Sequence, residues 1–311
     1  MTTATTTHPQ KENATAISQD TIPMVSVFCI TYNHGRFIAQ TLEGFLMQRT
    51  NFTFEVIIGD DCSTDGTTEI IQHYASKYPD IIKRLDRPHN IGPNQNSLEI
   101  AKNMRGKYVA ACDGDDFWTD PNKLQKQIDF LENNPEYIIC CHYTKEIAGD
   151  GTLLFVPPKV KPLVHTYSDL LVNKQTQTST ASVVYRNEPQ IRKMFLNDWF
   201  MEVVAADKFL RLYATWSSGK KIYVMPEIMS CYRKHAGGLW SATPPIPLKK
   251  RQLSDFQKIL SVFSFTPAQK VRTSYFYLTS YFGFEVKHFG WKQALSTLGK
   301  LLFNRNPHFQ R

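Results

Sequence analysis

The chain has 311 residues, 42% of them hydrophobic and 21% charged, which excludes a fibrous or wholly disordered protein and allows one large domain with an appendage. The net charge of +8 comes from residues 249–311, where eleven Lys and Arg side chains accompany two acidic ones. The rest of the chain is therefore near neutral, which disfavours a specific nucleic-acid partner.

Predicted strands and helices alternate along the first 140 residues. Short apolar runs predict strands at 25–30, 54–58, 81–85 and 108–112, and helical spacing of apolar residues predicts helices at 36–48, 67–78, 94–105 and 123–133. This alternation predicts βαβ units and an α/β fold with a mostly parallel sheet flanked by helices. Because such sheets bind ligands at the carboxyl ends of their strands, the polar residues that follow each strand are the candidate site.

The second half has a mixed pattern. Apolar runs predict strands at 138–142, 181–186, 222–224 and 228–232, and helices are predicted at 168–172 and 206–216. Three prolines and a basic run at 241–251 predict a linker that ends the domain. Residues 252–311 then predict a basic, aromatic, helical tail.

A cluster of carboxylates follows the strand predicted at 108–112. Asp113, Asp115 and Asp116 occupy three of four consecutive positions there. Such carboxylates are costly at the end of a buried strand unless a cation lies among them, and Mn²⁺ or Mg²⁺ suits oxygen ligands and phosphate. The cluster therefore points to chemistry on a metal-bound phosphate ester. The alternative is a solvated turn in which Gly114 adopts a positive φ.

Polar residues also follow the first two strands. Thr31, Tyr32 and Asn33 can hold a flat heterocycle by stacking and hydrogen bonding, or Asn33 can simply cap the next helix. Asp60 and Asp61 leave the second strand side by side, and a carboxylate there can accept from a base N–H and from ribose hydroxyls.

Three ordered segments resemble the nucleotide-sugar domain of family 2 glycosyltransferases. They are VSVFCITYNHGRFIAQTLEGFLMQ at 25–48, EVIIGDDCSTDGT at 55–67 and GKYVAACDGDD at 106–116. The resemblance covers roughly residues 24–240 and implies a GT-A, Rossmann-like domain at 23–240.

The resemblance also implies roles for individual residues. Asp113 and Asp115 match the DXD motif, in which the first aspartate meets ribose or metal and the second holds the metal on the diphosphate. The residues implied to bind the nucleotide are Thr31, Tyr32, Asn33, Asp60, Asp61, Asn90 and Asp113.

Two further segments of the family pattern lie downstream. Asp207 stands where the family has its catalytic base, although Ala206 replaces the usual acidic neighbour. Alternatively, Asp207 only stabilises the helix by lying at the positive end of its dipole. Glu202 is a second candidate base. Residues 231–241 resemble a Tyr-Arg-x-His-x-Gly-Gly loop that closes over the diphosphate. The resemblance implies that His235 binds metal or phosphate, that Arg233 neutralises the diphosphate, and that Trp240 belongs to this lid.

The function that the resemblance implies is inverting, metal-assisted transfer of a sugar from a UDP-sugar to a saccharide or lipid-linked saccharide, as in surface polysaccharide synthesis. One alternative is a nucleotide-sugar-binding module without turnover, which Ala206 leaves open. The other is a sugar nucleotidyltransferase, but such enzymes have a Gly-rich basic loop after strand one, where this chain has TYNHGRF.

The expected location of the protein follows from its cysteines and its tail. Six cysteines without Cys-x-x-Cys spacing indicate free thiols in a reducing, cytoplasmic compartment. No run of eighteen apolar residues occurs, and residues 1–22 are Thr-rich and polar, which predicts a disordered leader. Basic and aromatic residues at 270–305 predict contact with the inner face of a membrane, or equally a helical pair that packs on the domain.

Overall fold

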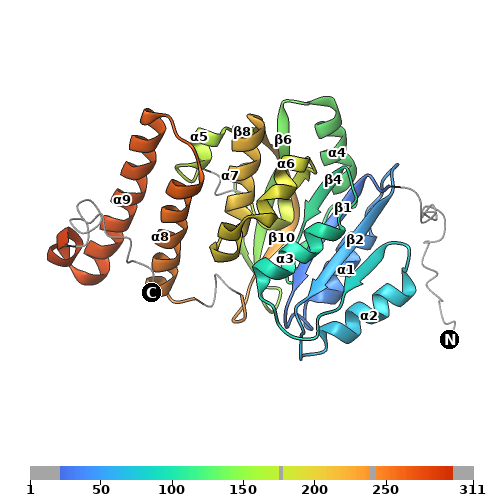
Figure 1. Cartoon of the computed structure of the whole chain (residues 1–311). Coiled ribbons are helices and arrows are strands. Elements are labelled where there is room, and N and C mark those ends of the chain that lie inside the picture. Colours follow the sequence, from blue (N-terminus) through green and yellow to red (C-terminus); the bar gives the residue numbers. More distant parts are fainter. Residues whose placement is uncertain (1–21, 175–177, 239–242, 297–311) are drawn as a thin grey trace.

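The computed structural model describes residues 22–174, 178–238 and 243–296 (Figure 1). The predicted leader at 1–22 therefore lies outside the described residues except for its last position. Trp240 and the end of the tail also lie outside them.

Within the described ranges, ten strands form one sheet in the order β3-β2-β1-β4-β9-β6-β10-β5, with β7 paired to β6 and β8 to β10. Strands β3, β2, β1, β4, β6 and β10 share one direction, while β9 runs antiparallel between β4 and β6. The predicted mixed, mostly parallel α/β fold is thereby confirmed. The strands are β1 (Val25–Thr31), β2 (Phe54–Asp60), β3 (Ile82–Leu85), β4 (Tyr108–Ala111), β5 (Phe117–Trp118), β6 (Tyr137–Ala148), β7 (Leu153–Phe155), β8 (Leu163–His165), β9 (Val184–Arg186) and β10 (Lys221–Lys234).

Helices cover both faces of the sheet because side chains of a buried strand alternate between its faces. Val25 and Val27 of β1 pack with α1, α2 and α4, whereas Phe28 packs with α3, α6 and α7 on the other face. The helices are α1 (Ile38–Leu46), α2 (Thr67–Lys77), α3 (Pro93–Asn103), α4 (Lys123–Asn133), α5 (Tyr167–Leu170), α6 (Pro189–Arg192), α7 (Ala206–Ser218), α8 (Pro245–Val262) and α9 (Pro267–Phe289).

Three differences from the predicted boundaries have a clear physical reason. β10 is one strand where two were predicted, because register shifts between Met225 and Ser230 accommodate Pro226 without ending the strand. β9 begins only at Val184, after a turn of 3₁₀ helix. Residues 245–251 form the first turns of α8 and not a linker, since proline is favoured at the first position of a helix, where its missing N–H costs nothing.

The helical pair α8–α9 lies against one side of the domain, next to α5 and α7 (Figure 1). Ile259 and Phe263 of this pair belong to the same hydrophobic core as α7. Asp255 accepts hydrogen bonds from the backbone N–H groups of Val204 (2.9 Å) and Ala205 (3.0 Å), immediately before α7. The predicted packing of the tail on the domain is therefore observed for α8. None of the helices in the described ranges is both long and apolar enough to cross a bilayer.

Candidate active site

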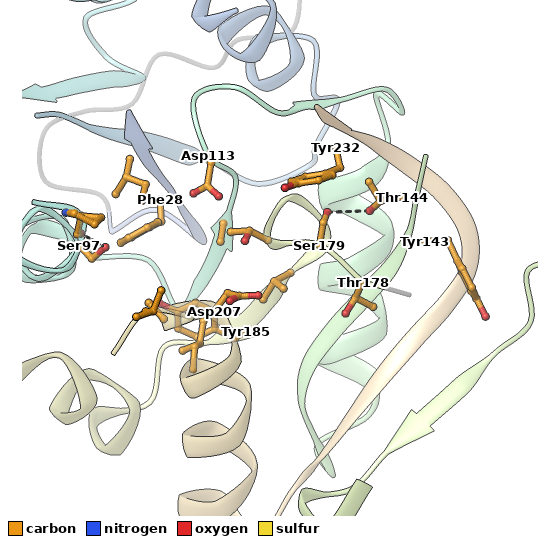
Figure 2. Close-up of a pocket in the computed structure, with 18 of the residues that line it drawn as sticks. Phe28, Ser97, Asp113, Tyr143, Thr144, Thr178, Ser179, Tyr185, Asp207 and Tyr232 are labelled. Atoms are coloured by element: carbon orange, nitrogen blue, oxygen red, sulfur yellow. Dashed lines mark hydrogen bonds between the residues drawn. The ribbon is translucent and has the colours of Figure 1, made fainter. Parts of the chain in front are cut away.

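A cavity of about 660 Å³ opens at the carboxyl ends of the parallel strands (Figure 2). Phe28 and Ile30 of β1 and Asp113 after β4 line one side, and Asp207 at the first turn of α7 lines another. Figure 2 shows the carboxylates of Asp113 and Asp207 on opposite sides of this space. Two of the acidic residues singled out in the sequence therefore meet in one cavity, although 94 positions separate them.

The Asp113 carboxyl is difficult to ionise in this setting. Burial, followed by the nearby carboxylates of Asp115 and Asp207, raises the pKa of Asp113 to about 8. A carboxylate held among other carboxylates in a buried place gains most from a cation. The electrostatics of this end of the cavity therefore favour binding of a metal ion.

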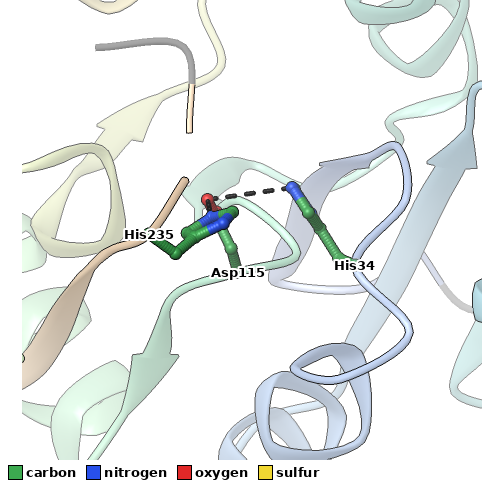
Figure 3. Close-up of side chains that lie close together, drawn as sticks. All are labelled: His34, Asp115 and His235. Carbon is green, nitrogen blue, oxygen red and sulfur yellow. Dashed lines mark hydrogen bonds and ion pairs between the residues drawn. The ribbon is translucent and has the colours of Figure 1, made fainter. Parts of the chain in front are cut away.

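A second group of side chains offers metal ligands beside the cavity: His34, Asp115 and His235 (Figure 3). Their ligand atoms lie within 4.8 Å of one another. The Oδ2 atom of Asp115 is 2.9 Å from Nε2 of His235 and 3.8 Å from Nε2 of His34. These residues come from three distant segments: the loop after β1, the loop after β4 and the end of β10.

The protonation states in this group suit metal binding. Burial lowers the pKa of His34, against the opposing effect of Asp115, so its imidazole stays neutral and its nitrogen can bind a metal. Burial disfavours the Asp115 carboxylate, but the hydrogen bond from His235 and the nearby imidazoles lower its pKa overall. One carboxylate and two imidazoles can accept a divalent transition-metal ion. Asp113, also predicted as a ligand, is not part of this group.

Asp207 is oriented by its own helix. Nη1 of Arg211 donates to Oδ2 of Asp207 at 2.7 Å, and the Arg211 side chain is only 4% exposed, so the guanidinium is a fixed partner. Because this bond engages only Oδ2, the other carboxylate oxygen is available to the cavity.

Arg233 is held in place by its neighbours. Its Nε donates to the backbone oxygen of Asp115 (2.9 Å) and its Nη2 to Gln40 (2.6 Å), while the guanidinium lies over the rings of Phe37 and Phe117. The side chain is buried and bonded to these two residues, so Arg233 fixes the loop that carries Asp115. Its contact with a diphosphate stays a prediction.

The residues predicted at the ends of β1 and β2 lie together. Thr31 and Asp60 are neighbours in register, and Asp60 accepts hydrogen bonds from the hydroxyls of Ser63 and Thr68. Asp61 is buried and accepts from the backbone N–H groups of Ile91 (2.7 Å) and Gly92 (2.9 Å). Asp61 therefore holds the loop of residues 90–92 against β2.

The remaining predicted residues flank this edge. The Asn33 side chain accepts from the N–H of Thr64, which joins the loops after β1 and β2. The Asn90 side chain accepts from the N–H of Gly92. Tyr32 is 46% exposed, so its ring faces solvent beside these loops.

Sequence reasoning missed two residues. His34 is assigned no role from the sequence, because its proximity to Asp115 depends on the adjacency of β1 and β4, which the chain order does not give. Arg211 lies four positions after Asp207, and this i,i+4 spacing on a predicted helix was a usable signal for an ion pair.

Comparison with known proteins identifies the family. The model described as glycosyl transferase family 2 matches residues 26–176. An uncharacterized protein of Mycobacterium tuberculosis is 38% identical over 221 residues, which is 70% of this chain and 60% of the relative. The putative glycosyltransferase EpsE of Bacillus subtilis is 35% identical over 133 residues, which is 43% of this chain and 44% of EpsE.

Solved structures share the fold. S. aureus TarS in complex with UDP-GlcNAc aligns with a TM-score of 0.64 at 21% identity and covers 89% of this chain and 80% of that one. The mannosyltransferase PcManGT from Pyrobaculum calidifontis, in complex with GDP-Man and Mn²⁺, gives 0.60 at 15% identity, with coverage of 93% and 78%. The fold is the GT-A fold, and through residues 26–176 the chain belongs to glycosyltransferase family 2. The chain spans 60% of the length of the mycobacterial relative.

Proposed function

We propose that this protein is an inverting glycosyltransferase that moves a sugar from a UDP-sugar to a saccharide or a lipid-linked saccharide. The observation that carries the proposal is the shared cavity of Asp113 and Asp207, with the group formed by His34, Asp115 and His235 beside it. The complexes of TarS with UDP-GlcNAc and of PcManGT with GDP-Man and Mn²⁺ support a nucleotide-sugar donor and a divalent cation. A role in surface polysaccharide synthesis agrees with the names of EpsE and of TuaG, a putative teichuronic acid biosynthesis glycosyltransferase.

The acidic end of the cavity suits the diphosphate of the donor. Asp115 and the two imidazoles would hold Mn²⁺ or Mg²⁺, with Asp113 as a ligand or as a partner of the ribose. Such an ion neutralises negative charge that develops on a leaving diphosphate. Arg233 keeps the Asp115 loop in place through its bond to the Asp115 backbone, which is a positioning role.

Asp207 is the proposed general base. Arg211 bonds to Oδ2, so Oδ1 accepts the proton of the acceptor hydroxyl. As that proton leaves, the acceptor oxygen forms a bond to the anomeric carbon, and the bond from this carbon to the diphosphate oxygen breaks on the opposite face. A donor with an α linkage then gives a β-linked product, and no covalent enzyme intermediate forms.

The uridine is proposed to bind at the ends of β1 and β2. The exposed ring of Tyr32 suits stacking on the base, and Asp60 lies at the same sheet edge with Thr31 and Asn33 beside it. Asp61 and Asn90 shape the loop of residues 90–92 that flanks this place.

The proposal includes two domains and a cytoplasmic location for the protein. We place the catalytic domain at residues 23–240 and the helical extension after it. Exposed Tyr275, Phe289 and Trp291 on the helical extension are candidates for contact with the inner face of a membrane. This arrangement suits a cytoplasmic enzyme that acts on a lipid-linked acceptor.

The test is release of UDP from a panel of UDP-, GDP- and dTDP-sugars with Mn²⁺ or Mg²⁺, followed by excess EDTA. The proposal expects release from one UDP-sugar that EDTA abolishes. If no donor is turned over, calorimetry with UDP and Mn²⁺ on the same sample decides between two cases. Binding without turnover, even with candidate acceptors present, would favour a nucleotide-sugar-binding module, and absence of binding would overturn the proposed site. Release of pyrophosphate from UTP and a sugar phosphate would instead indicate a nucleotidyltransferase.

A further inference from the structure

A second cavity, of about 290 Å³, lies between α7 and the helical pair α8–α9. It adjoins the first cavity, because Thr178 and Asp207 line both. A molecule whose hydroxyl reaches Asp207 can therefore extend a neighbouring group into this space. The lining has polar groups from α7 and α8 and an aromatic wall from α9.

Three cationic side chains line this second cavity: Lys208, Arg211 and Lys249. Nζ of Lys249 donates to Oγ of Ser280 at 2.9 Å, and Nζ of Lys208 donates to the hydroxyl of Tyr277. Within the described part of the chain, neither lysine forms an ion pair with a carboxylate. Both ammonium groups are therefore bonded to neutral hydroxyls, although they face the same cavity.

The carboxylates of this cavity already have partners. Oδ2 of Asp207 is bonded to Arg211, and the two oxygens of Asp255 accept the backbone N–H groups of Val204 and Ala205. Lys208 lies near enough to Asp255 to lower the pKa of that carboxyl, but burial outweighs this effect and raises it. The two lysines thus retain positive charge that no carboxylate in the cavity fully neutralises.

The setting of Lys249 disfavours its positive charge. Burial, and then the positive charge of Lys208, lowers the pKa of Lys249. Two cations that line one cavity repel each other, and an anion bound in that cavity lowers the cost of holding them there. The geometry of the cavity therefore already suits an anionic ligand.

We propose that the second cavity binds an anionic group of the acceptor, a phosphate or a sugar carboxylate, next to the hydroxyl that Asp207 deprotonates. The inference rests on the proposed function, because it assigns the substrate class of the same site. Lys208 and Lys249 bind the anion, and the rings of Phe276, Tyr277 and Tyr281 offer apolar surface to the attached sugar or polyol. The enzyme thereby selects charged acceptors over neutral ones through α8 and α9.

The experiment is a calorimetric titration of the full chain after saturation with UDP and Mn²⁺, so that the donor site is already filled. The probes are glycerol 3-phosphate, methyl β-glucuronide and the uncharged methyl β-glucoside. We compare the unaltered protein with Lys249→Gln and with Lys250→Gln, an exposed neighbour that does not line the cavity. We expect millimolar binding of an anionic probe, weakened about tenfold by Lys249→Gln and unchanged by Lys250→Gln.

The outcomes distinguish a phosphate from a carboxylate as the anionic group. They also distinguish failure of the second cavity from failure of the donor site. Binding of glycerol 3-phosphate alone indicates a phosphodiester acceptor, and binding of the glucuronide alone indicates a uronic acid. Equal binding by the two variants, or no preference for the anionic probes over methyl β-glucoside, overturns the inference. The preceding titration with UDP and Mn²⁺ shows whether the donor site exists, so its failure is distinct from a failure of the second cavity.

Discussion

The two adjoining cavities carry opposite charge. At the strand ends, burial and then the nearby carboxylates of Asp115 and Asp207 raise the pKa of Asp113. In the second cavity, which Lys208 and Lys249 line, burial and then the positive charge of Lys208 lower the pKa of Lys249. Uncompensated charge of one sign indicates the ligand expected in each place: a cation with the donor diphosphate in the first, and an anion on the acceptor in the second.

Asp207 lies where the two cavities meet, and its replacement is expected to have the largest effect. Asp207→Asn removes the proton acceptor while leaving a side chain of similar size, so sugar transfer should fall by about 10³-fold or more. Affinity for UDP with Mn²⁺ should stay unchanged, because the residues proposed to bind the metal and the diphosphate lie on the other side of the cavity. Asp198→Asn, at an exposed position, is the matched control. Turnover retained by Asp207→Asn would reject the assignment of the base and direct attention to Glu202.

Asp115→Ala tests the proposed metal site at the strand ends. The variant removes the carboxylate that both imidazoles approach, so affinity for UDP in the presence of Mn²⁺ should fall by about a hundredfold. Affinity for UDP in EDTA should hardly change, and Asp80→Ala at an exposed position should behave as the unaltered protein. Calorimetry measures both. An equal loss with and without metal would mean that Asp115 supports the fold of the loop and not a metal site.

His34 offers a finer test of the same group. Its Nε2 is 3.8 Å from Asp115, further than that of His235, and its Nδ1 is 3.1 Å from Oγ1 of Thr31. His34→Gln should weaken Mn²⁺-dependent binding of UDP by about tenfold, less than Asp115→Ala, since one neutral ligand is lost and the charge remains. The exposed His73→Gln is the control. Unchanged metal dependence in His34→Gln would restrict the group to Asp115 and His235.

The comparison also shows what a sequence can reveal. Asp60 ends β2, and Asp113 and Asp115 directly follow β4. Because parallel strands bring such positions to one edge of a sheet, the location of these three carboxylates could be predicted. The basic cavity combines α7, α8 and α9, and its geometry depends on Asp255 bonding to the backbone before α7. That contact spans about fifty residues and has no local pattern. For the same reason, the sequence predicts a linker at 241–251, although residues 245–251 begin a helix that packs on the domain.

The smallest effect is expected for Lys123, which in the described part of the chain is an unpaired cation outside both cavities. Like Lys249 it is a cation without a carboxylate, but its side chain is fully buried, its Nζ has no hydrogen-bond partner among the described residues, and it lies 4.1 Å from the ring of Trp118. Neither of the two cavities described above is lined by Lys123. Burial lowers the pKa of Lys123 to about 7. An unpaired cation should indicate a ligand only where a cavity exists. The contribution of Lys123 to the free energy of unfolding should therefore depend on pH and not on added anions.

The direction of that response follows from proton binding. Between pH 7 and the ordinary lysine value of about 10.4, the unfolded chain keeps the proton that folded Lys123 releases, so rising pH favours the folded state. The free energy of unfolding should rise by about 1 kcal/mol from pH 7 to pH 8 through this group, and Lys123→Met should remove that increment. Urea unfolding of both proteins at several pH values, with and without glycerol 3-phosphate, measures it. A difference between the two proteins that does not depend on pH would show that folded Lys123 keeps its proton, and a difference that depends on glycerol 3-phosphate would show that an anion reaches the core. Either result would contradict the premise that an unpaired cation indicates an anionic ligand only where a cavity is present. The assignment of the second cavity depends on this premise.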